Sequence, residues 1–191
     1  MKKAIVTGGS SGIGRSICKA LSDEGCQVVN ISRRRESKED NIPIDTLPNI
    51  TTEICDVRNI KLLQKLVEKH NPDILINNVG VMPLVDLLTH TEKDYDWIMD
   101  TNFKSAVFAT QMALRGMLRK GSGSIINISS TSGIHANPDS PVYGASKAAL
   151  ISLTKTVACQ YGDIVQCNCI CPGLIDTFLV SSDEPLPESE I

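Results

Sequence analysis

A tyrosine and a lysine one helical turn apart, Tyr143 and Lys147, are the residues of this sequence best suited to acid–base chemistry. Residues at positions i and i+4 lie on one face of a helix, so the phenol and the ammonium group are neighbours. A phenol has an ordinary pKa of about 10, and an adjacent positive charge stabilises its phenolate. Because Tyr-x-x-x-Lys also arises by chance, a core tyrosine beside a solvated lysine stays open as the alternative.

Ser130 strengthens the catalytic interpretation. It follows the apolar run of residues 124–128, which predicts a strand, and it precedes Tyr143 by thirteen positions. A hydroxyl at the end of that strand can bond a substrate oxygen beside the phenol. Together the three side chains favour proton transfer to or from an oxygen atom.

A glycine turn near the start of the chain predicts a phosphate site. The apolar run at residues 4–6 predicts a strand, and apolar residues at helical spacing follow Gly14. A turn between a strand and a helix directs the helix N-terminus at an anion, and glycine lets the backbone approach a pyrophosphate closely. An ordinary glycine turn is the alternative. The residues of this predicted site are Gly8, Ser10, Ser11, Gly12, Ile13 and Gly14.

Strands and helices alternate along the rest of the chain. We predict further strands at residues 27–31, 50–55, 73–76, 124–128 and 164–171, and helices at 60–70, 95–118 and 141–161. Residues 36–49 have no helical periodicity and suggest a loop or a degraded helix. This order predicts an α/β fold with a doubly wound parallel sheet of about six strands in three layers, of the Rossmann type. Ligands of such sheets bind beyond the carboxyl ends of the strands.

Composition narrows the function classes. The 191 residues suit a single domain, and the net charge of −3 favours neither nucleic acid nor an anionic membrane as a partner. With no apolar stretch long enough to span a bilayer or serve as a secretory signal, we expect a cytoplasmic protein. Among the seven cysteines, Cys167, Cys169 and Cys171 alternate along a predicted strand. We interpret them as reduced thiols in core packing, and we expect no metal site.

Seven motifs, in order and in register from about residue 2 to residue 177, resemble the short-chain dehydrogenase/reductase family. They are Thr7-Gly8-x-x-x-Gly12-Ile13-Gly14, Asp56-Val57, Asn77-Asn78-Val79-Gly80, Asn102, Ser130, Tyr143-x-x-x-Lys147 and Pro172-Gly173. The resemblance implies an oxidoreductase that interconverts a carbonyl compound and an alcohol with a nicotinamide cofactor.

The resemblance also implies a role for each catalytic residue. Tyr143 is the acid that protonates the carbonyl oxygen, and Ser130 orients that oxygen. Lys147 bonds the nicotinamide ribose and lowers the pKa of Tyr143. Asn102 holds a water molecule that relays protons towards Lys147; a helix-interior asparagine bonded to solvent or backbone is its alternative.

Further positions are implied to contact the cofactor. Asp56 and Val57 contact adenine, Asn78 lies along the adenosine ribose, and Thr177 binds the carboxamide of the nicotinamide. Val79, Gly80, Pro172 and Gly173 are further cofactor-binding positions. Val79 stands where alanine is more usual in the family, which adds bulk near the cofactor.

Cofactor choice depends on the end of the second predicted strand. Relatives that use NAD place an acidic residue there, which binds the ribose 2′-hydroxyl and repels a 2′-phosphate. This chain has Ser32 followed by Arg33, and a guanidinium group suits a phosphate. We therefore predict NADP(H) rather than NAD(H). A solvated turn formed by Arg33, Arg34 and Arg35 is the alternative.

The last part of the chain departs from the family pattern. Members usually continue with two helices and a seventh strand, whereas this sequence ends fourteen residues after Thr177. We expect an open side on the substrate pocket, a sixth strand left as an edge, and a poorly ordered tail at residues 181–191. A truncated, poorly active or non-catalytic dinucleotide-binding protein is the second hypothesis. A sugar-nucleotide epimerase or dehydratase is weaker, because those relatives need a larger C-terminal domain.

Two expectations concern partners. The segments at residues 131–142 and 81–88 should flank a small-molecule carbonyl or alcohol substrate, with His135 facing solvent. The helices at 95–118 and 141–161 should pair between subunits in a homodimer or homotetramer, as they do in relatives.

Overall fold

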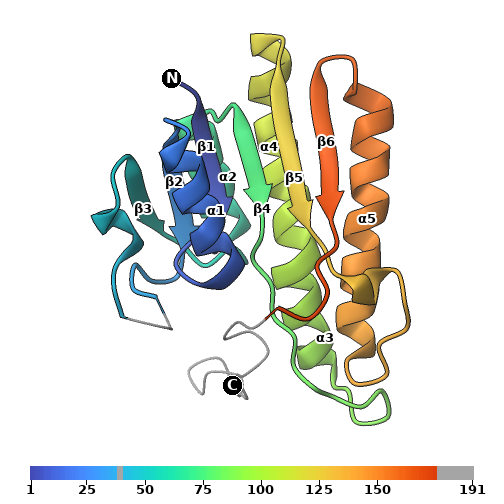
Figure 1. The fold of residues 1–191 in the computed structure, drawn as a ribbon. Coiled ribbons are helices and arrows are strands. Elements are labelled where there is room, and N and C mark those ends of the chain that lie inside the picture. Colours follow the sequence, from blue (N-terminus) through green and yellow to red (C-terminus); the bar gives the residue numbers. More distant parts are fainter. Residues whose placement is uncertain (38–40, 176–191) are drawn as a thin grey trace.

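The computed structural model describes residues 1–37 and 41–175, and within them six parallel strands form one sheet (Figure 1). Their order across the sheet is β3-β2-β1-β4-β5-β6. The chain moves outward from β1 to β3 and then returns to β1's other side with β4, so the switch point lies between β1 and β4. The strands are β1 (Lys3–Thr7), β2 (Gln27–Ser32), β3 (Ile50–Ile54), β4 (Ile74–Asn77), β5 (Gly123–Ile128) and β6 (Val165–Ile170). The predicted doubly wound fold is confirmed.

Helices cover both faces of the sheet. The larger core cluster joins one face to three helices, through residues such as Leu63, Met117 and Val157. The smaller cluster joins the other face to α1 through Cys18 and to a short 3-10 helix through Ile44. Within the described residues β6 pairs only with β5. The α-helices are α1 (Gly12–Asp23), α2 (Ile60–His70), α3 (Glu92–Met99), α4 (Ser105–Lys120) and α5 (Pro141–Tyr161).

The single helix predicted at residues 95–118 is wrong in its bounds and its continuity. A capping box starts α3 earlier: Thr91 Oγ1 accepts a hydrogen bond from the Asp94 backbone N–H at 3.2 Å, and the Thr91 N–H donates to the Asp94 carboxylate at 3.0 Å. Between α3 and α4 the chain forms a π-helical turn, Asp100–Lys104. Such turns are rare and often occur at functional sites. Asn102 lies within it.

Between β2 and β3 the described residues contain no α-helix. The chain there forms an isolated bridge between Glu36 and Pro43 and the 3-10 helix η1 (Ile44–Thr46), which is fixed by fully buried Ile44. Of the two possibilities for residues 36–49, the loop is therefore the right one for the described part.

Two composition-based expectations can be compared with the structure. Cys167 is buried in the larger core cluster, whereas Cys169 and Cys171 are only partly buried. The described residues hold no cluster of three or more histidine, cysteine or acidic side chains suited to a metal. None of the helices among them is long and apolar enough to cross a membrane.

Candidate active site

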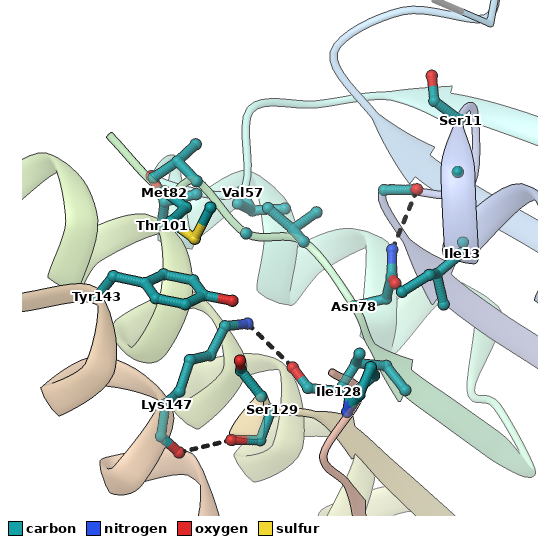
Figure 2. A pocket seen from close by; sticks show the side chains of 18 of the residues that line it. Ser11, Ile13, Val57, Asn78, Met82, Thr101, Ile128, Ser129, Tyr143 and Lys147 are labelled. Carbon is teal, nitrogen blue, oxygen red and sulfur yellow. Dashed lines mark hydrogen bonds between the residues drawn. The ribbon is translucent and has the colours of Figure 1, made fainter. Parts of the chain in front are cut away.

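A cavity of about 810 Å³ opens at the carboxyl ends of the strands and collects most of the predicted site residues (Figure 2). Segments far apart in the sequence meet there because parallel strands end at the same edge. The predicted residues that line it are Gly8, Ser10, Ser11, Gly12, Ile13, Gly14, Ser32, Arg33, Asp56, Val57, Asn78, Val79, Gly80, Ser130, Tyr143, Lys147, Pro172 and Gly173. Asn102 is not in its lining, and Thr177 and the tail at 181–191 lie outside the described residues.

The glycine turn needs glycine for two separate reasons. Gly8 and Gly12 have φ values of +71° and +52°, which side chains rarely adopt. Gly14 lies so close to Gly8 that an added Cβ would be 2.2 Å from the Gly8 carbonyl oxygen. The tight turn brings the first residues of α1 to the cavity, where the positive end of the helix favours an anion.

Buried amides hold this turn to the neighbouring strands. Asn30, fully buried in β2, accepts a hydrogen bond from the Gly9 N–H at 2.7 Å. Asn78 Nδ2, after β4, donates to the carbonyl oxygens of Thr7 and Gly8 at 3.0 and 3.2 Å. Asn30 was not predicted from the sequence, although one asparagine within the apolar run of residues 28–31 was a usable signal.

One end of the cavity is basic. Arg33 and Arg34 line it together with Arg58, which forms an ion pair with Asp56 at 2.7 Å. Burial acts to raise the pKa of Asp56, but the hydrogen bonds from Arg58 and the charge of Arg33 outweigh it and hold the pKa below its usual value. Asp56 is therefore a carboxylate, and this end carries a net positive charge.

The other end holds Tyr143, Lys147 and Ser130. Lys147 Nζ lies 5.6 Å from the centre of the Tyr143 ring and donates a hydrogen bond to the Ile128 carbonyl oxygen at 3.0 Å (Figure 2). The Tyr143 hydroxyl interacts with the Ser130 side chain. Burial lowers the pKa of Lys147 to about 8. A pKa lowered this far by burial makes the amine a candidate functional group.

The pKa of Tyr143 differs from the sequence-based expectation. Burial raises it, and the hydrogen bond with Ser130 opposes only part of that increase. The lysine was expected to lower the phenol's pKa, whereas the net shift here is upward and is caused by burial. Tyr143 is therefore protonated at neutral pH, which suits a proton donor.

Asn102 lies behind the cavity and fixes its wall. Its amide exchanges two hydrogen bonds with the backbone of Val81, at 2.8 and 2.9 Å, and donates a third to Ser146 Oγ at 3.1 Å. A Cβ added at Gly80 would contact both Lys147 Nζ and Asn102 Oδ1, so the asparagine lies near the lysine. Both amide hydrogens are bonded to protein acceptors, and the amide oxygen accepts one of the two hydrogen bonds that it can accept.

Several lining residues were not predicted individually. Met82 and Pro83 come from the segment expected to flank a substrate, whereas Trp97 comes from α3 and Thr101 from the π-helical turn that also holds Asn102. Trp97 and Thr101 are four residues apart, and Thr101 directly precedes Asn102; that spacing was a signal that could have found them. His135 is exposed, as expected.

Comparison with known proteins identifies the family. The sequence profile described as short chain dehydrogenase matches residues 2–186. A tropinone reductase homologue of Arabidopsis thaliana is 35% identical over 188 residues, which cover 93% of this chain and 69% of that protein.

Two solved structures share the fold. A 4-hydroxyisoleucine dehydrogenase complexed with NADH is 28% identical with a TM-score of 0.83, covering 94% of this chain and 78% of its own. An actinorhodin polyketide ketoreductase variant with NADPH is 27% identical with a TM-score of 0.86, covering 94% and 73%. The fold, the motifs and these matches agree, and the chain belongs to the short-chain dehydrogenase/reductase family.

Proposed function

We propose that this protein is an NADP(H)-dependent oxidoreductase that interconverts a ketone or aldehyde and an alcohol, with Tyr143 as the acid or base. The observation that carries the proposal is the arrangement of one cavity. Tyr143, Ser130 and Lys147 lie at one end, the glycine turn lies along it, and Arg33 lies at the other. This lining fits an extended dinucleotide, with a phosphate-accepting turn between an adenosine end and a reactive end.

The proposed mechanism assigns one task to each side chain. A nicotinamide cofactor, when bound, supplies or accepts the hydride. Ser130 donates a hydrogen bond to the substrate oxygen and orients it, and Tyr143 donates its proton to that oxygen as negative charge develops there. Lys147 holds a positive charge beside the phenol and stabilises the phenolate that remains. Asn102 would support this arrangement by fixing Val81 and, through a bound water, by relaying protons towards Lys147.

The preference for NADP(H) is part of the proposal. The relatives above include one complex with NADH and one with NADPH, so they favour neither cofactor. Ser32 and Arg33 supply the argument, because no acidic side chain stands at the end of β2 to repel a 2′-phosphate. Asp56 and Val57 would contact adenine, Asn78 would lie along the adenosine ribose, and Thr177 would bind the nicotinamide carboxamide. Val79, Gly80, Pro172 and Gly173 would also contact the cofactor.

Replacing Arg33 with alanine is expected to raise the KM for NADPH about tenfold or more and to leave the KM for NADH nearly unchanged, because a charge-assisted bond to phosphate is lost. Steady-state kinetics with both cofactors measure this. Arg35→Ala is the matched control, since Arg35 is already paired with Asp45 at 2.9 Å and does not line the cavity. An unchanged NADPH preference in the Arg33 variant would contradict the assignment.

The pH dependence of carbonyl reduction should follow the protonation of Lys147. With a pKa lowered to about 8, the lysine keeps its charge below that pH and loses it above. Because the raised pKa of Tyr143 keeps the phenol protonated beyond that point, we expect kcat/KM for NADPH to fall from about pH 8 upward. A profile that stays flat to pH 10 would show that the ammonium group is not required.

The experiment that tests the whole proposal is NADPH oxidation with a panel of ketones and aldehydes. Turnover of any member supports an enzyme. NADPH binding without turnover of any of them favours the second hypothesis, a non-catalytic dinucleotide-binding protein. The arrangement of subunits through α4 and α5, in a homodimer or homotetramer, belongs to the proposal and is checked by light scattering.

A further inference from the structure

Two thiols that the proposed reaction does not use lie at the end of β6. Cys169 is the last residue but one of the strand, and Cys171 is the first residue after it. Alternate residues of an extended chain lie on one face, and, besides burial, Cys171 raises the pKa of the Cys169 thiol, so the two thiols are neighbours. They form a dithiol, which differs chemically from two isolated cysteines.

The pairing of the strands places this dithiol beside the active-site lysine. Ile170, between the two cysteines, pairs with Ile128 of β5. The carbonyl oxygen of Ile128 is the acceptor that holds Lys147 Nζ at 3.0 Å. The two thiols therefore flank the position that anchors the lysine, and both interact electrostatically with it.

The end of β6 is also bonded to the segment that carries Ser130. The Ser129 N–H donates to the Ile170 carbonyl oxygen at 2.8 Å, and the Thr131 N–H donates to that of Pro172 at 2.9 Å. These bonds lie on either side of Ser130 in one segment and of Cys171 in the other. Backbone hydrogen bonds thus connect the end of β6 directly to the segment that carries Ser130.

We propose that Cys169 and Cys171 form a modification site for trivalent organic arsenicals, and that its occupation stops turnover by displacing Lys147. With an arsine oxide, two S–H bonds break and two As–S bonds form, and the arsenic-bound oxygen leaves as water with both protons. Arsenic stays trivalent, so the step requires no oxidant or reductant.

The geometry favours an arsenic bridge over a disulfide. Residues i and i+2 of a strand are about 6.6 Å apart, and their parallel Cβ atoms are farther apart than the ~4 Å that a disulfide needs. An arsenic atom between the sulfurs spans a wider gap. Burial raises the pKa of the Cys169 thiol, which makes it a poor target for reagents that require a thiolate.

Phenylarsine oxide titrated into the full chain tests the site directly. We expect one adduct per chain by native mass spectrometry, with parallel loss of NADPH-dependent turnover. The dithiol 2,3-dimercaptopropanol should reverse both effects, while the same concentration of 2-mercaptoethanol should not, because a chelating pair raises the effective thiol concentration. Absence of a dithiol-reversible adduct overturns the site.

Single substitutions locate the adduct. Cys169→Ser and Cys171→Ser should each weaken phenylarsine oxide binding about tenfold or more, as loss of chelation predicts. Cys159→Ser, at an exposed lone cysteine of α5, should bind the reagent like the parent chain. Cys167→Ser tests whether the reagent instead binds the pair formed by Cys167 and Cys169. If Cys167→Ser lost the adduct and Cys171→Ser kept it, the assignment would be overturned. Alanine variants replace any serine variant that fails to fold.

The dithiol site and its effect on turnover can be contradicted by separate results. The adduct does not depend on the proposed reductase activity, whereas its effect on turnover does. A stoichiometric adduct that leaves turnover unchanged would overturn the coupling to Lys147. An adduct on a chain without any reductase activity would retain the dithiol site, overturn its stated effect on turnover and contradict the proposed function.

Discussion

Tyr143→Phe is expected to lower kcat for carbonyl reduction about a thousandfold, because it removes the only proton donor that we place at the substrate oxygen. The change deletes one oxygen atom and preserves the ring of a residue that is only 5% exposed. Burial raises the pKa of this phenol, so the phenol carries its proton at neutral pH. Removing the hydroxyl therefore lowers kcat by the full contribution of that proton. The measurement is NADPH oxidation with whichever carbonyl compound the panel identifies.

The matched control is Tyr161→Phe. Tyr161 ends the same helix and packs against the larger core cluster, far along α5 from the catalytic turn. It should retain full activity. NADPH binding should survive in both variants, and Trp97, the sole tryptophan, lines the cavity and can report it by energy transfer to the reduced nicotinamide. Full activity in Tyr143→Phe would remove the phenol from the mechanism.

The alternation of apolar runs and helical stripes predicted the fold well, because the apolar pattern within most segments matches the strand or helix that the segment forms. Residues 164–171 could be assigned to a strand from alternation alone, and Cys167 does face the core. The π-helical turn at Asp100–Lys104 could not be predicted, because its extra residue per turn is stabilised by tertiary bonds. Asn102 forms those bonds with Val81 and Ser146, which are distant in the sequence.

The candidate site also has features that the sequence reveals and features that only the packed structure reveals. The glycine turn and the Tyr143–Lys147 pair have local spacing, so the sequence reveals them. The pKa of Tyr143 depends on how many atoms exclude water from the ring, and that is a property of packing. Asn30 is similar: its hydrogen bond to Gly9 exists only because β1 and β2 pair in parallel. Spacing identifies which groups are present, and packing sets their electrostatic state.

Gly14→Ala is expected to destabilise the protein by about 2 kcal/mol and to weaken NADPH binding at least about tenfold. In an ordinary helix this substitution would stabilise by about 1 kcal/mol. Here the new methyl group would be 2.2 Å from the Gly8 carbonyl oxygen and 2.5 Å from Asn78 Nδ2. Overpacking of this kind costs about 3 kcal/mol, which reverses the sign. The clash can be relieved only by moving the turn that we propose holds the pyrophosphate.

Gly121→Ala separates this clash from the general cost of replacing a glycine. Gly121 ends α4 with a φ of +76°, and an added Cβ would meet nothing within 4 Å. Its variant should lose about 1 kcal/mol from backbone strain alone and bind NADPH with unchanged affinity. Thermal unfolding and NADPH titration of both variants give the comparison. If Gly14→Ala bound NADPH as tightly as Gly121→Ala, the turn's close approach to Gly8 would have no part in holding the cofactor.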